Sequence, residues 1–147
     1  MAIHSRALKG LAAKNWVEIM EANEYLEDIK SRLIASNAIA AFTIVEELDF
    51  GDRGYFRARV TLSNDDFLEV AEYFKITNNV VTTTRYRYQW MECDRTKLRK
   101  RWDNVPHFPN LPNFPHHIHV ESEENVVSGY VLSIQDLLDI LEKEIEI

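Results

Sequence analysis

The sequence predicts an α+β domain: an antiparallel meander of four to five strands with an N-terminal and a C-terminal helix packed on one face. Apolar or alternating segments are separated by short turns, and strands joined in this way pair antiparallel. A segment with an apolar stripe at helical spacing stands on either side of them. The chain of 147 residues has the length of about one domain. We expect residues 20–147 to form that domain and residues 1–19 to be an N-terminal extension.

Four segments are predicted as strands, residues 39–48, 55–62, 67–76 and 80–90, and a fifth strand is expected within residues 97–102. The second segment alternates most clearly, with apolar side chains on one face and polar ones on the other. In the fourth, an aromatic row alternates with arginines. That row either stacks unpaired bases or, as we favour, belongs to the core under a helix, which leaves the arginine face for a partner.

The two predicted helices each carry one apolar stripe. The first begins at Glu21 and ends near Ser36. Ser133 precedes the second helix, and Asp136 stands three residues later, as in a capping box. The stripes consist of Tyr25, Leu26, Ile29 and Leu33 in the first helix and of Ile134, Leu137, Leu138, Leu141 and Ile145 in the second.

Composition indicates where the protein works. No run approaches the ~18 apolar residues that a membrane-spanning helix needs, and the first residues contain no apolar signal segment. Cys93 is the only cysteine, which excludes an internal disulfide and a thiolate-rich zinc site. We therefore expect a soluble cytoplasmic protein without a membrane partner.

The charge is unevenly distributed. The net charge is −7, yet residues 85–101 hold seven basic and two acidic residues, so this window is +5 and the remainder is −12. A basic stripe on an acidic domain can steer an anion to one face, although a solvated hairpin gives the same pattern. The candidate RNA-binding residues are Arg85, Arg87, Arg99 and Lys100.

All four prolines fall in the segment 105–116, which we call the proline strap, and they recur at every third position. Proline excludes a helix or a central strand, and a period of three matches a polyproline II helix. Phe108, Leu111 and Phe114 would then form an apolar edge that docks on the domain. The alternatives are a purely structural strap with incidental histidines and, less consistent with that apolar edge, a ligand for an SH3-type partner.

His117 and His119 project to the same side of an extended chain. Two imidazoles on one face suit metal ligation or general acid–base chemistry, and a surface cluster without a role is the third interpretation. A metal site would need a further ligand from a distant residue. The candidates for that ligand are His107, Asp103, Glu72 and Cys93.

Metal-free cleavage of a phosphodiester is the working hypothesis, with no metal and no cofactor. One histidine would take the proton of a ribose 2′-OH, the other would protonate the leaving oxygen, and Arg101 would neutralise the developing charge. Asp103 would orient a histidine through its free ring nitrogen. We therefore expect His117, His119 and Arg101 to converge. The candidate catalytic residues are His117, His119, His116, Arg101, Asp103, His107 and Glu72.

Glu72 stands within an apolar row of its predicted strand. A charge buried there must be paired or neutralised, and Arg85 or Arg87 on the following strand could pair it. The functional interpretation is a base of raised pKa or a residue that positions a histidine or arginine. The alternatives are a structural ion pair and a local bulge that turns Glu72 outward.

The runs Arg101-Trp-Asp-Asn-Val-Pro-His107 and Phe114-Pro-His-His-Ile-His119 resemble the TumE-like family of toxin–antitoxin toxins. The resemblance extends from about Glu21 to Ile145, while the length of the acidic insert near residues 122–125 departs from the pattern without touching the two runs. It implies a growth-inhibiting toxin held inactive by a helix-turn-helix antitoxin. It supplies a biological role but no reaction.

Taken together, these features predict a toxin that acts as a metal-independent endoribonuclease, with RNA and the antitoxin as partners. One alternative is a metal-dependent hydrolase that uses the same histidines. The other is a toxin without enzymatic activity that binds and blocks a cellular target.

Overall fold

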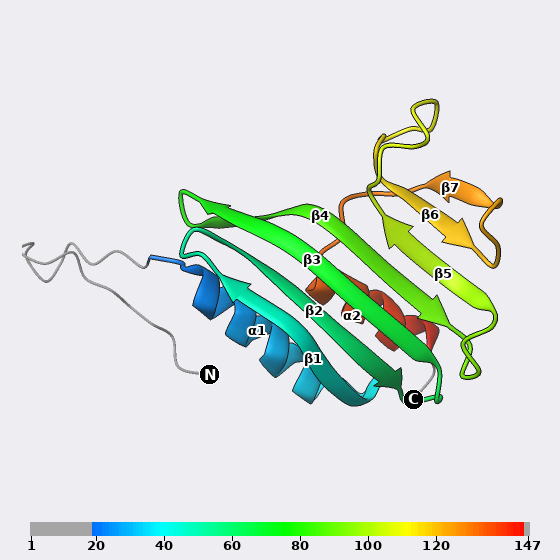
Figure 1. The fold of residues 1–147 in the computed structure, drawn as a ribbon, viewed down its shortest axis with the longest axis horizontal. Coiled ribbons are helices and arrows are strands. Elements are labelled where there is room, and N and C mark those ends of the chain that lie inside the picture. Colours follow the sequence, from blue (N-terminus) through cyan, green and yellow to red (C-terminus); the bar gives the residue numbers. More distant parts are fainter. Residues whose placement is uncertain (1–18, 146–147) are drawn as a thin grey trace, which may run out of the picture.

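The computed structural model describes residues 19–145, and within them the chain forms one seven-stranded antiparallel sheet and two helices (Figure 1). The strands follow one another across the sheet in sequence order, so the sheet is a meander. The elements are α1 (Ala22–Ala35), β1 (Ile39–Asp49), β2 (Arg53–Leu62), β3 (Phe67–Thr77), β4 (Val80–Met91), β5 (Leu98–Asp103), β6 (His117–Val120), β7 (Val126–Ser128) and α2 (Ile134–Glu144).

The α+β class and the antiparallel meander were predicted correctly, but the expected four to five strands were too few. The first five strands lie where the sequence placed them. The surplus comes from β6 and β7, which have 4 and 3 residues. β6 coincides with the extended segment expected for His117 and His119, which was not counted as a strand of the sheet, and β7 holds too few residues for a period of two to be recognised. Of the predicted extension, residues 1–18 lie outside the described part of the chain.

Both helices lie on the same face of the sheet (Figure 1), and the hydrophobic core lies between the helices and the sheet. The predicted apolar stripes of both helices are buried, and so is the aromatic row of β4. Ser133 caps α2 through a complete capping box with Asp136, as the sequence indicated. Arg32 of α1 binds Glu142 of α2 at 2.6 Å and thereby ties the two helices together. Within residues 19–145, neither helix is long and apolar enough to cross a membrane.

The proline strap does not form the predicted polyproline II helix. Such a helix has no internal hydrogen bonds, whereas the strap is a series of turns in which Leu111 N donates to Phe108 O and His116 N to Asn113 O. Asn113 also has a φ of 62°, in the left-handed region. The apolar edge is divided as a result, since Phe108 is half-buried while Phe114 is 43% exposed.

Candidate functional site

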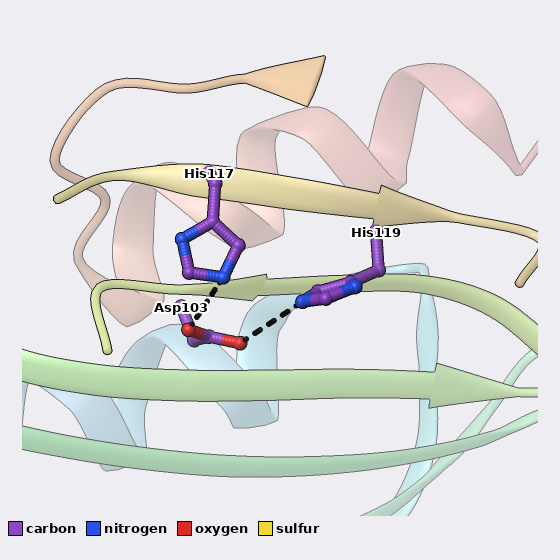
Figure 2. Close-up of side chains that lie close together, drawn as sticks. All are labelled: Asp103, His117 and His119. Atoms are coloured by element: carbon purple, nitrogen blue, oxygen red, sulfur yellow. Dashed lines mark ion pairs between the residues drawn. The ribbon is translucent and has the colours of Figure 1, made fainter. Parts of the chain in front are cut away.

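The pairing of β5 with β6 builds the candidate site. Asp103 stands opposite His117, and Arg101 stands opposite His119. Because side chains alternate along a strand, these four point to the face that the helices leave uncovered, while Trp102 between them is buried in the core. Figure 2 shows Asp103, His117 and His119 gathered on that side, with the helices behind the sheet. Arg101, His117 and His119 thus converge, as their positions in the sequence led us to expect.

The carboxylate of Asp103 joins the two imidazoles. Its Oδ1 lies 2.9 Å from Nε2 of His117, and its Oδ2 lies 3.8 Å from Nε2 of His119 (Figure 2). The exposed fractions are 3% for Asp103, 2% for His117 and 5% for His119. We call these three residues the buried triad. Charged or polar groups removed from water in this way need partners.

The other ring nitrogen of each histidine faces a backbone carbonyl. Nδ1 of His117 lies 2.9 Å from the oxygen of Pro115, and Nδ1 of His119 lies 2.9 Å from the oxygen of Glu123. A carbonyl oxygen only accepts, so the proton of each neutral ring is on Nδ1. Both Nε2 atoms then present a lone pair toward Asp103.

Arg101 and a backbone amide hold the carboxylate from the outside. Arg101 Nε donates to Oδ2 of Asp103 at 3.2 Å, and the amide of Val105 donates to Oδ1 at 3.0 Å. The Arg101 guanidinium also binds the carboxylate of Glu123 at 2.6 Å, a hydrogen bond that lowers the pKa of Glu123. The acidic insert near residues 122–125 therefore does touch the site, since Glu123 contacts both His119 and Arg101.

Phe108 of the proline strap covers the triad. Its ring meets the His117 ring edge to face, with centroids 4.8 Å apart, and the His119 ring at 5.8 Å. The two imidazoles lie 5.0 Å apart at 75°. The strap thus places an apolar ring where solvent would otherwise reach the histidines.

The remaining candidate histidines lie outside the triad. The Tyr86 hydroxyl is 2.9 Å from Nδ1 of His116 and donates to the oxygen of Tyr130 at 3.1 Å. His116 also stacks on the Tyr86 ring, and its partial burial lowers its pKa. His107 is exposed on the strap, with its ring 6.3 Å from that of Phe108.

Glu72 is fully buried, but on the helix face of the sheet and not in the triad. It accepts hydrogen bonds from Tyr25 Oη at 2.7 Å, Thr83 Oγ1 at 2.8 Å and the amide of Ile134 at 2.9 Å. Burial raises its pKa. The expected pairing with Arg85 or Arg87 is wrong because both arginines point to the opposite face. Glu72 instead fastens α1, β4 and the start of α2 to β3.

The four candidate RNA-binding residues of the basic stripe fall into two pairs. Arg85 lies over the Tyr73 ring at 5.4 Å, and Arg87 is exposed on the uncovered face, where it binds Gln89. By contrast, the other two basic residues form ion pairs with carboxylates. Arg99 pairs with Asp66 at 3.0 Å, and Lys100 pairs with Glu144 at 2.6 Å.

Two rows of paired side chains cross the uncovered face from β2 to the triad. They begin at Arg57 and Arg59 on β2, two residues that were not among the predicted site residues. The alternation of β2 was visible, but which strands would be neighbours of the histidine strand was not. One row ends at His117 and the other at His119. The pairing gives the rows Arg57, Ala71, Arg87, Asp103, His117 and Arg59, Glu69, Gln89, Arg101, His119.

A groove of about 510 Å³ lies beside these rows. Tyr55 and Tyr73 lie there with ring centroids 4.2 Å apart and ring planes tilted by 32°, and Arg85, Arg87 and Pro106 also line it. The groove is therefore lined by aromatic rings and arginines, and it reaches the proline strap that covers the triad.

A family model described as Toxin TumE matches residues 27–147. The chain belongs to the TumE toxin family. The match covers both sequence runs around the triad, so the TumE assignment and the candidate site concern the same part of the chain. No curated protein and no solved structure gives a match. Membership in the TumE family makes this chain the toxin component of a toxin–antitoxin pair, with an antitoxin as its partner.

Proposed function

We propose that this TumE toxin arrests growth by cleaving RNA and that the buried triad with Arg101 is the centre at which cleavage occurs. One observation carries the proposal: the carboxylate of Asp103 contacts both His117 and His119. This cluster lies where the two side-chain rows that begin at Arg57 and Arg59 end. Titratable groups gathered in a buried position are typical of functional sites.

The uncovered face supplies what a single-stranded RNA requires. Arg87 and Arg85 can hold phosphates, and such contacts position a nucleic acid without reading its sequence. Tyr73, which is 43% exposed beside the buried Tyr55, offers ring surface for an unpaired base, a contact that tolerates any base. Since the chain as a whole carries a charge of −7, an RNA is drawn to this face and repelled elsewhere.

Arg101 is the expected anion stabiliser. Its guanidinium lies beside Asp103 and is fixed by Glu123 and by Gln89 at 3.3 Å, so it is held in one orientation before a substrate arrives. A preoriented cation of this kind stabilises charge that develops on a phosphate without reorganising during the reaction.

His117 and His119 are too deeply buried to act as the free acid and base that the sequence led us to expect. Acid–base catalysis by a free imidazole needs a ring nitrogen that reaches the ribose. His117 and His119 are 2% and 5% exposed, and their Nε2 atoms face Asp103. Cleavage at the triad therefore requires either that the strap moves aside or that a species bound by the triad performs the chemistry.

The test is inducible expression of the full chain and of His117→Gln, His119→Gln and Asp103→Asn, with growth and total RNA integrity followed together. Each triad variant should lose both growth arrest and RNA cleavage. His107→Gln is the matched control, because His107 is exposed on the proline strap outside the triad, and it should retain both. Arrest by the unaltered chain with intact RNA would contradict the proposal and favour a toxin that blocks a target by binding.

We also propose that the antitoxin is a helix-turn-helix protein and that the toxin acts in the cytoplasm, where its RNA substrate is found. Both rest on the family resemblance and on the proposed reaction. Sequencing of the neighbouring gene and co-purification with its product would test the first, and fractionation of expressing cells would test the second.

A further inference from the structure

We propose that Asp103, His117 and His119 bind one divalent transition-metal ion, and that Zn²⁺ is the expected occupant. The potential ligand atoms of the three side chains all lie within 4.8 Å of one another. The binding of the ion is argued from these side chains alone; only its use in cleavage rests on the function proposed above.

The hydrogen bonds of the two histidines prepare them as ligands. A metal-binding imidazole usually donates its second N–H to a carbonyl or carboxylate, which fixes the ring and leaves the other nitrogen free for the metal. His117 and His119 both follow this pattern through the carbonyls of Pro115 and Glu123, each at 2.9 Å. Because two separate backbone carbonyls bind the same ring nitrogen, Nδ1, in both histidines, both Nε2 atoms are left free to bind one ion.

The spacing of the donor atoms suits a small ion. Zinc binds nitrogen and oxygen at about 2.0–2.2 Å in a tetrahedron, which separates neighbouring donors by roughly 3.3 Å. The observed separations are 2.9 Å from Asp103 Oδ1 to His117 Nε2 and 3.8 Å from Asp103 Oδ2 to His119 Nε2, and one donor atom of each side chain lies within 4.8 Å of the others. The donors are thus grouped on the scale of one ion, and side-chain rotation would bring them to tetrahedral distances.

A single added proton would pair the buried polar groups of the triad less completely than a metal ion would. One added proton on His117 would make a hydrogen bond to Asp103 at 2.9 Å, but the contact of His119 at 3.8 Å is too long for such a bond. The lone pair of a neutral His119 would then face a carboxylate oxygen in a buried position. A cation among the three donors is attracted to both lone pairs and to the carboxylate at once.

The donor set selects the class of metal. Mg²⁺ and Ca²⁺ prefer sites made of oxygen ligands, whereas two imidazoles with one carboxylate suit zinc and its first-row neighbours. The ligating carboxylate is itself held by Arg101 Nε and the amide of Val105, and Phe108 limits access of water. Such surroundings fix the ligands and tune the bound metal.

In the proposed function, such an ion would supply what the buried imidazoles do not. Three protein ligands leave room for a water on a catalytic zinc, and zinc lowers the pKa of that water to about 7. The three ligands would hold the ion, and Arg101 would remain the cation beside it, bound to Asp103 and Glu123.

The test uses the full chain without an affinity tag, purified from its complex with the antitoxin and stripped with a chelator. One equivalent of Zn²⁺ should bind, as measured by elemental analysis after desalting, and should raise Tm by about 5–10 °C at a hundredfold excess over Kd. Co²⁺ should give the absorption bands of a tetrahedral site. Failure of the unaltered chain to bind either ion stoichiometrically would overturn the proposal without reliance on any variant.

Variants locate the ion. Asp103→Asn, His117→Gln and His119→Gln should each weaken Co²⁺ binding by roughly 100-fold or more, the upper end of what loss of a supporting contact alone costs. His107→Gln and Glu72→Gln are controls for an exposed histidine and for a buried carboxylate of the opposite face, and both should bind as before. Circular dichroism of each variant confirms that it is folded. Binding that persists in all three triad variants would assign the ion elsewhere.

Metal binding and RNA cleavage are read separately in the same preparations. Stoichiometric binding with intact RNA supports the metal site and contradicts the proposed reaction. Cleavage by the stripped chain, with no ion bound, supports the proposed reaction and contradicts a role of the ion in it, while the binding measurements decide the metal site itself.

Discussion

Asp103 and His117 stand directly opposite each other in the β5–β6 pairing, with 2.9 Å between the carboxylate Oδ1 and the ring Nε2. Both side chains are almost completely buried. The proline strap connects the two strands and also contributes the carbonyl of Pro115, which orients the His117 ring. The same segment therefore joins β5 to β6 and orients a histidine of the site.

This relationship predicts a strong energetic coupling between the two residues in the metal-free chain. When His117 carries the added proton, removing either partner takes away their hydrogen bond and leaves the other group buried without it. Asp103→Asn and His117→Gln should then each destabilise the fold, while the double variant should cost less than their sum. We expect a coupling of about 1–3 kcal/mol in urea unfolding. The cycle of Asp103→Asn with His107→Gln is the control and should be additive, because His107 is exposed.

The sequence predicted the parts of this arrangement that repeat or that carry unusual side chains. The alternation of residues 55–62 identified β2, and Ser133 with Asp136 identified the start of α2. The spacing of His117 and His119 indicated that both face one side, and Asp103 was among the expected ligands or orienting groups. These signals are local, so they do not depend on how the chain folds back.

Other features could not be predicted because they depend on distant or generic groups. The carbonyl of Pro115 orients His117, and every residue has a carbonyl. Glu72 finds its partners on α1 and at the start of α2, which no strand register reveals. The strap has the proline spacing of a polyproline II helix, but turn hydrogen bonds and the left-handed Asn113 determine its path.

Phe108 should shield the triad from reagents. In the chelator-treated chain, Phe108→Ala should make His117 and His119 react much faster with diethyl pyrocarbonate, as mapped by mass spectrometry of peptides. Because Phe108 is only half-buried, the substitution should lower the free energy of unfolding by about 1–2 kcal/mol, less than for a core phenylalanine. Phe114→Ala is the control, since Phe114 is 43% exposed on the same strap. Equal reactivity in the two variants would show that Phe108 is not the cover.

Glu72 should make the stability of the fold depend on pH. Burial raises the pKa of Glu72 above its ordinary value of 4.5, so the folded chain holds this proton more tightly than the unfolded chain does. Its contribution to stability is therefore fully present below the unfolded pKa and is lost as pH rises through the folded pKa. Relative to Glu72→Gln, the unaltered chain should lose stability as pH increases above about 4.5.

Urea unfolding at several pH values from 4 upward measures this difference. The hydroxyl of Tyr25 donates to Glu72 at 2.7 Å and favours its ionised form, so Tyr25→Phe should extend the loss of stability to higher pH. Parallel pH profiles of the unaltered chain and Glu72→Gln would show that the carboxyl titrates as it does in the unfolded chain.

Arg87 and Lys100 should differ in their effect on RNA, although both belong to the basic stripe. Arg87 is exposed on the uncovered face in the row that ends at His117, whereas Lys100 is paired with Glu144 at 2.6 Å. Binding of a fluorescent single-stranded RNA with 2′-O-methyl groups to the chelator-treated chain can be titrated at several salt concentrations, because the methyl groups prevent attack by the 2′ oxygen and removal of the ion prevents attack by a metal-bound water. Arg87→Ala should weaken binding and reduce the salt slope by about 1, as expected for loss of one phosphate contact. Lys100→Ala should leave both unchanged, and equal losses in the two variants would place the RNA elsewhere than on the uncovered face.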